Sequence, residues 1–171
     1  LTSAKNGIGV DKLLDAIIDR IPSSKGDINS PLQALIFDSF YDPYRGVVAL
    51  IRVVNGKVKV GDKIKLMATS KVEEVTELGI NTPKEVKKEY LSAGDVGYLC
   101  ASIKDISDIK VGDTITLDSN PALEKLPGYK PMKPMVFSGI YPIETNKYPD
   151  LRDALEKLKL NDASLEFTPE T

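Results

Sequence analysis

The chain of 171 residues has 23 lysines and arginines against 25 aspartates and glutamates, a net charge of −2, and 42% hydrophobic residues. This composition is typical of a soluble globular protein of one or two domains, and no apolar run reaches the roughly 18 residues that a membrane span needs. The absence of histidine excludes Ser-His and Cys-His nucleophile pairs and His-ligated metals, and the single cysteine excludes an internal disulfide.

An amphipathic helix is predicted over residues 10–21. It follows a glycine-rich turn that begins with Ser3-Ala4-Lys5, and it ends before Pro22. A wide apolar stripe needs a covering surface, and the few residues before the helix cannot supply one. We therefore predict that the helix packs on a further domain. The apolar residues of the stripe recur at i, i+3, i+4 and i+7 spacing: Val10, Leu13, Leu14, Ile17, Ile18 and Ile21.

Strand-like patterns begin after a polar connection at residues 22–31. Asn55-Gly56, between ALIRVV and KVKV, predicts a β-hairpin at that point. The residues after it alternate between apolar side chains and lysines, which indicates one buried and one wet face. About seven short strands at this spacing predict a closed barrel or a sandwich. The clearest runs are LQALIFDSF, GVVALIRVV, KVEEVTELGI, VGYLCASI and TITL.

Three Gly-Asp pairs, at residues 61–62, 94–95 and 112–113, predict tight turns between these strands. Glycine supplies a positive φ, and the aspartate side chain can bond the backbone. The return of VGDKI as VGDTI is explained by this turn chemistry without a duplication. Cys100 lies in the apolar run VGYLCASI, so we interpret it as a small core residue and not as a nucleophile.

A second boundary is predicted in the proline-rich stretch at residues 118–134. Beyond it, MVFSGIYPIE is predicted as a strand, a helix follows Pro149, and SLEFTPE is predicted as a returning strand. This is a β-α-β half of a small α+β domain. The predicted organisation is 1–25 as the end of one domain, 26–119 as a barrel, 120–133 as a linker and 134–171 as the start of a third domain.

Lysines gather in two stretches of the predicted barrel. They form either solvated strand faces, which composition alone favours, or a local cationic patch that faces phosphate. The first stretch holds Lys57, Lys59, Lys63, Lys65 and Lys71, and the second holds Lys84, Lys87 and Lys88. No catalytic residue and no metal site is predicted.

The stretch YRGVVALIRVVNGKVKVGDKI resembles the second-domain barrel of translational GTPases, through Gly46, Arg52-Val53, Gly56, Val58 and Gly61-Asp62. SAKNGIG with the helix after it is similar to the last guanine-binding element and closing helix of their GTPase domain. LQALIFDSFYDPYRGVV, ELGINTPKEV and the segment from Pro127 are most similar to the LepA (elongation factor 4) family. Elongation factor G and the tyrosine-phosphorylated protein A GTPase are the next alternatives.

The resemblance implies a mainly β fold: a translation-factor-type closed barrel between an N-terminal helix and half of a ferredoxin-like domain. It implies a fragment of a ribosome-associated GTPase that acts on elongation, translocation fidelity or ribosome assembly. GTP and Mg²⁺ belong to the whole protein; this chain lacks the phosphate-binding loop, so we predict that it holds no cofactor and is inactive. The Ala4 N–H would donate to the guanine oxygen, with Ser3 bracing the loop and Lys5 lying along the base, but a frayed end is the favoured interpretation.

The resemblance also implies partners and a location. The barrel would contact ribosomal RNA and transfer RNA and would pack on the GTPase domain of its own protein. The protein would be cytoplasmic, with peripheral association with the inner membrane and no transmembrane segment. Without the resemblance, a non-enzymatic β-barrel adaptor, docking through the stripe of residues 10–21, is the alternative.

Overall fold

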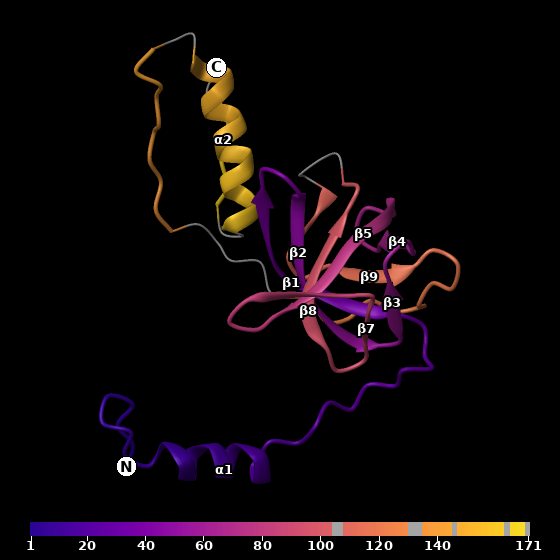
Figure 1. Ribbon diagram of the computed structural model, residues 1–171. Helices are drawn as coiled ribbons and strands as arrows, with labels where there is room; N and C mark the ends of the chain where they lie inside the picture. The colour runs from indigo at the N-terminus through magenta and orange to yellow at the C-terminus, as the bar shows by residue number, and fades with distance from the viewer. Residues whose placement is uncertain (104–107, 130–134, 145–146, 163–164, 170–171) are drawn as a thin grey trace.

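The structure is a computed structural model, and it describes residues 1–103, 108–129, 135–144, 147–162 and 165–169. An antiparallel β-barrel forms its centre, with one helix on each side in the sequence (Figure 1). The strands are β1 (Gln33–Asp42), β2 (Gly46–Asn55), β3 (Lys57–Lys59), β4 (Lys63–Leu66), β5 (Val72–Asn81), β6 (Glu85–Lys88), β7 (Tyr90–Ser92), β8 (Val96–Ala101) and β9 (Thr114–Leu117). The helices are α1 (Val10–Arg20) and α2 (Tyr148–Asn161).

The barrel closes because β4 pairs with both β9 and β5. The sheet runs β4-β9-β1-β2-β8-β5-β6, and the extra β4–β5 pairing joins its first strand to β5. Strand β6 lies outside this ring and pairs, among the described strands, only with β5, while β3 and β7 form a separate two-stranded sheet. Closure removes the exposed strand edges that an open sheet would leave. The predicted closed barrel is therefore confirmed.

Alternating side chains give the barrel an interior and a second cluster on its outer surface. Ala49 and Ile51 of β2 point into the main core, so Val48 and Leu50 between them lie on the opposite face. There they pack with Tyr98 and Cys100 of β8. The main core is built from Leu32, Ala34, Ile36, Val47, Ala49, Ile51, Val53, Val58, Ile64, Leu66, Val75, Leu78, Leu91, Leu99, Ala101, Ile109 and Ile115.

The predicted Gly-Asp turns are present, and the aspartates act as expected. Gly61 has φ 86° and Gly94 has φ 100°, which favour glycine. In both turns the carboxylate accepts a backbone N–H from three residues earlier: Asp62 from Lys59 at 2.8 Å, and Asp95 from Ser92 at 2.8 Å. In VGDTI, Gly112 has φ 91° and the Asp113 N–H donates to the Lys110 carbonyl at 3.0 Å, but the Asp113 carboxylate accepts the N–H of the distant Ala68 at 3.1 Å. The two repeats therefore share the backbone turn and not the partner of the aspartate side chain.

The hairpin predicted at Asn55-Gly56 is wrong. Strand β2 pairs with β1 and β8, whereas β3 pairs with β7. Gly56 turns the chain with φ 75°, but a Cβ there would lie 2.7 Å from the backbone N of Leu32, and the Gly56 N–H donates to the carbonyl of Asp27. The segment that contains Asp27 and Leu32 thus occupies the space beside Gly56, and the chain continues from Gly56 into β3 of the β3–β7 sheet.

The segments that flank the barrel are bonded to it. Before β1, the Asp27 N–H donates to the side-chain oxygen of Asn55 at 3.0 Å. After β9, the N–H groups of Ala122 and Leu126 donate to the hydroxyls of Thr116 and Thr114, at 2.8 and 2.9 Å. The described start of the proline-rich stretch therefore follows the barrel wall.

The predicted helix near the C-terminal end of the chain is present, but the two strands beside it are not. Helix α2 lies next to β1, where the Lys157 ammonium is 5.1 Å from the ring centre of Tyr41 (Figure 1). Residues 135–144 and the described residues 165–169 form no strand, and Met135 and Phe137 are exposed. A strand needs a neighbour for its backbone groups, and no described strand pairs with these segments. The predicted β-α-β unit is corrected to a helix with extended flanks.

The predicted amphipathic helix is present as α1, and its apolar face is uncovered within the described chain. Residues 1–9 form a small loop, and α1 lies at the end of an extended segment, away from the barrel (Figure 1). Leu14 and Ile18 are 53% and 78% exposed. Among the described residues, no helix is both long enough and apolar enough to cross a bilayer.

Candidate nucleic-acid interface

The β3–β7 pair brings the two lysine stretches together. Lys59 of β3 lies opposite Tyr90 of β7, and the Val60 N–H donates to the carbonyl of Glu89 at 3.1 Å. Lys88, the last residue of β6, directly precedes Glu89. One end of the first stretch therefore meets one end of the second, although the two lysine clusters lie far apart in the sequence.

The outer face of this pair carries lysines around an aromatic ring. Val58 and Leu91 are buried beneath the pair, so their neighbours in the strands face outward. The Lys57 ammonium lies 3.5 Å from the ring centre of Tyr90, at cation–π distance. Tyr90 is still 47% exposed, and Lys59 is exposed beside it. Sequence reasoning missed Tyr90, although an aromatic residue that follows a lysine run was the available signal.

The second stretch splits between two faces of β6. The Lys87 ammonium forms an ion pair with Glu77 of β5 at 2.6 Å. By strand alternation, Lys88 points to the opposite face from Lys87. Among the described residues, no carboxylate forms an ion pair with Lys59, Lys84 or Lys88. Those three exposed lysines are therefore available for an external anion, and so is exposed Lys63, which forms no ion pair among the described residues either.

The remaining lysines lie elsewhere. Lys63 and Lys65 are on the outer face of β4, with Lys63 opposite Glu74 of β5. Lys71 forms an ion pair with Asp108 at 2.5 Å. The structure therefore does not join these three lysines to the β3–β7 face, and of the three only Lys71 forms an ion pair among the described contacts.

A charged clamp holds β6 against the barrel, and sequence reasoning did not anticipate it. The Arg45 guanidinium, in the β1–β2 turn, donates to both carboxylate oxygens of Glu85 at 2.9 and 3.2 Å, and to Asp42 at 3.3 Å. The hydrogen bond to Glu85 raises the pKa of Arg45 further, so the guanidinium stays charged. Backbone N–H groups of Arg45 and Tyr44 hold the pKa of Asp42 below its usual value. The bidentate geometry fixes the position of β6.

Glu77 links the clamp to the outer cluster. It accepts hydrogen bonds from Lys87 and, at 3.0 Å, from the Tyr98 hydroxyl, and these bonds, Lys87 first, lower its pKa. Burial, together with Glu77, raises the pKa of Tyr98 to about 12. Burial also raises the pKa of the Cys100 thiol to about 11, so it stays protonated at neutral pH. A buried neutral thiol fits the structural interpretation of Cys100.

Ser3, Ala4 and Lys5 lie in the loop before α1, and the N-terminal end of the chain lies away from the barrel strands in Figure 1. The Ser3 N–H donates to the carbonyl of Ile8 at 2.9 Å, and the Ile8 N–H donates back at 3.1 Å. Ala4 and Lys5 are exposed at the tip. The loop is therefore ordered by its own backbone.

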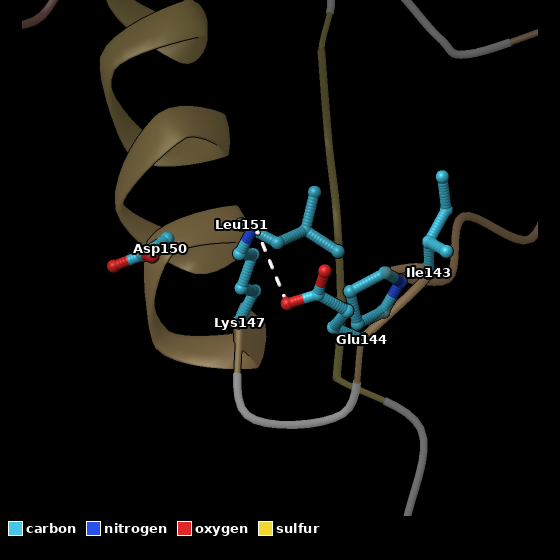
Figure 2. A pocket seen from close by; sticks show the side chains of 6 residues that line it. Ile143, Glu144, Lys147, Asp150 and Leu151 are labelled. Atoms are coloured by element: carbon cyan, nitrogen blue, oxygen red, sulfur yellow. Dashed lines mark ion pairs between the residues drawn. The ribbon is translucent and has the colours of Figure 1, made fainter.

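A surface pocket of about 370 Å³ lies at the start of α2 (Figure 2). Ile143 and Leu151 line it together with Glu144, which is 3.4 Å from the Lys147 ammonium. This ion pair joins two exposed side chains of the pocket lining. The pocket therefore offers few polar groups that are free to orient a ligand.

Comparison with known families first defines the class of the barrel. Residues 46–116 match the family model described as elongation factor Tu domain 2. This stretch runs from the start of β2 into β9, so most of the closed barrel is of the translation-factor domain 2 type.

The whole chain is then similar to one particular translation factor. It is 62% identical over 171 residues to elongation factor 4 of Streptococcus thermophilus, and 61% identical to the elongation factor 4 proteins of Streptococcus suis over 170 residues and Streptococcus agalactiae over 171. The matches cover all or nearly all of this chain, which spans 28% of the length of these relatives. The LepA resemblance seen in the sequence is therefore confirmed: the chain is related along its length to part of elongation factor 4.

A solved structure supports the fold. A crystal structure of a protein from Thermus thermophilus superposes with a TM-score of 0.76 at 26% identity. The match covers 98% of this chain and 25% of that protein.

Proposed function

We propose that this chain is part of a longer, cytoplasmic, GTP-hydrolysing translation factor of the LepA type that works on the ribosome. The observation that carries the proposal is the 62% identity to elongation factor 4 over the whole chain. In this proposal the protein acts on elongation, translocation fidelity or ribosome assembly. Peripheral association with the inner membrane is part of the same proposal. The exposed face of α1 supports a covering domain, which we propose to be the GTPase domain of the same protein.

The barrel is proposed as the part that contacts ribosomal RNA. Lys59, Lys84 and Lys88 are exposed and form no ion pair among the described residues, so they can neutralise phosphates without losing an internal partner. Lys57, Lys63 and Lys65 are proposed as weaker contacts, and Lys87 as a residue that mainly holds β6. Contacts of this kind position a protein on RNA without reading its sequence, and transfer RNA would be held through the same chemistry.

The chain by itself is proposed to bind GTP at most weakly. The loop at Ser3, Ala4 and Lys5 fits a minor role, because it offers one exposed backbone segment to a guanine edge and its own backbone bonds keep it closed. The phosphate-cradling sequence Gly-x-x-x-x-Gly-Lys-Ser/Thr does not occur in the chain. When GTP and Mg²⁺ are bound to the longer protein, they supply the hydrolysable phosphate and its charge neutralisation.

Calorimetric titration of the chain with GTP and Mg²⁺ tests this part of the proposal. We expect no heat of binding at micromolar GTP. A micromolar affinity for this chain would contradict it.

Co-sedimentation with small ribosomal subunits at several salt concentrations tests the barrel. We expect the double variant Lys59→Glu and Lys88→Glu to bind more weakly and to reduce the slope of log K against log salt by roughly 1–2. The matched control, Lys110→Glu with Lys125→Glu, makes the same change of charge at two exposed lysines outside both stretches. Equal binding by the two double variants would overturn the assigned interface.

A further inference from the structure

The feature that the charged face alone does not explain is Tyr90. It is a large aromatic side chain on a two-stranded sheet outside the closed barrel, and 47% of it is exposed. Its strand is short, but it is anchored by buried Leu91 and by pairing with β3. The Tyr90 ring therefore projects from a paired strand and not from a loop.

If the cation–π contact with Lys57 were its only interaction, the Tyr90 ring would have a purely structural role. The Lys57 ammonium, 3.5 Å from the ring centre, lies over one face. One ammonium covers one face of a ring, and the remaining exposed surface stays in water beside exposed Lys59. Single exposed aromatic rings are common on protein surfaces, so what sets Tyr90 apart is the cationic groups around it and not its exposure.

The neighbours of Tyr90 suit a nucleotide. Lys59 lies directly across the strand pair from Tyr90, and Lys88 lies two residues before it in the chain, so the strands bring two further cationic residues close to the ring. Proteins that hold single-stranded nucleic acid combine aromatic rings, on which bases stack, with lysines that contact the backbone phosphates. The Lys57 ammonium over one face of the Tyr90 ring is compatible with a base stacked on the other face.

We propose that the β3–β7 face is a stacking platform for an unpaired RNA base, with Tyr90 as the stacking residue and Lys59 and Lys88 as phosphate contacts. This inference rests on the proposed function, because it names the part of the RNA that this face takes. The platform binds single-stranded nucleotides in preference to a duplex, since a paired base presents no free face.

Glu89 makes the proposal more specific. It is exposed and lies in the sequence between Lys88 and Tyr90, and its backbone carbonyl, not its carboxylate, accepts the Val60 N–H. Its side chain therefore places a negative charge beside the platform without a structural bond of its own among the described contacts. Removing that charge with Glu89→Gln is expected to raise RNA affinity at low salt by about 2- to 5-fold.

The test uses the whole chain and a short single-stranded oligouridylate with one central 2-aminopurine, whose fluorescence falls when it stacks on an aromatic ring. We expect wild type and Tyr90→Phe to quench the fluorophore. Tyr90→Leu is expected to abolish the quench and to lower affinity roughly 5- to 100-fold. Tyr44→Leu is the matched control, because Tyr44 is 96% exposed in the β1–β2 turn and belongs to neither β3 nor β7.

The outcomes separate this inference from the proposed function. Equal quenching and affinity for wild type and Tyr90→Leu, with both proteins folded by circular dichroism, would show that Tyr90 does not stack. Failure of wild type to bind the oligonucleotide at low salt would also overturn the platform. The ribosomal proposal would survive both results if the Lys59→Glu and Lys88→Glu variant still lost subunit binding.

Discussion

Substitution of Gly79 by alanine tests how tightly the outer cluster is packed. Gly79 lies in β5 opposite Tyr98 of β8. A Cβ at this position would lie 2.5 Å from the Cε1, Cζ and hydroxyl oxygen of Tyr98, a distance that real Cβ atoms essentially never show. The ring cannot easily move away, because Tyr98 is 1% exposed and its hydroxyl donates to Glu77.

The expected cost follows from two opposing effects. Overpacking of a filled site costs about 1–3 kcal/mol. Alanine also restricts the unfolded chain, which returns about 0.4–1 kcal/mol where the backbone permits it, and Gly79 has no positive φ. We therefore expect Gly79→Ala to lower the free energy of unfolding by about 1–2 kcal/mol, or roughly 2–8 °C in Tm for a chain of this size.

A double-mutant cycle by urea denaturation isolates the cause. Tyr98→Phe retains Cε1 and Cζ, so Gly79→Ala should remain destabilising in that background. Tyr98→Leu removes those atoms, so in that background Gly79→Ala should be neutral or slightly stabilising. The coupling energy between the two positions is then about 1 kcal/mol or more. The same cost of Gly79→Ala in all three backgrounds would refute the steric argument.

Three further predictions concern the charged clamp and the buried thiol. Arg45→Ala should lower the free energy of unfolding by about 1–2 kcal/mol. A double-mutant cycle with Glu85→Ala should give a coupling energy of about 0.5–1 kcal/mol, because both side chains are partly exposed. Additive effects of the two substitutions would show that the ion pair between Arg45 and Glu85 contributes nothing. The folded-state pKa of Glu77 is below its ordinary value of 4.5, so its stabilising contribution is present above that pH and is lost as the pH falls through the folded value. The free energy of unfolding, measured by urea denaturation at several pH values in this acid range, should therefore fall less steeply with falling pH for Glu77→Gln than for the wild type. An unchanged slope would contradict the stabilising role assigned to the Glu77 carboxylate. Cys100 should not react with Ellman's reagent in the native chain at pH 8 and should react fully in denaturant, because burial raises its pKa to about 11; rapid native labelling would be the opposing result.

The local features of the candidate site could be predicted only in part. The two lysine stretches are visible in the sequence, and so is the exposed loop at residues 3–5. That Lys87 and Lys71 bond carboxylates of the chain, whereas Lys59 and Lys88 do not, depends on which strands lie beside them. Asp108 is 37 residues from Lys71, and Glu77 meets Lys87 only through the register of the β5–β6 pair, so neither pairing is visible in the sequence around the lysine.

The sequence by itself determined the elements whose cause lies within a few residues. Apolar periodicity encodes α1 and the barrel strands, and the Gly-Asp pairs encode their turns, because φ preferences and side-chain bonds to the adjacent backbone act over short distances. The number and spacing of the strands predicted a closed barrel or a sandwich, and the family resemblance favoured the barrel.

Tertiary structure alone decided which strand pairs with which. Asn55-Gly56 reads locally as a hairpin, yet Asp27 and Leu32 occupy that corner and β3 continues to β7. The same long-range pairing sets Tyr90 beside Lys59, and the lack of a described pairing partner leaves residues 135–144 without a strand. Backbone hydrogen bonds between strands carry no signature in either strand's own sequence, and only the packed chain selects among them.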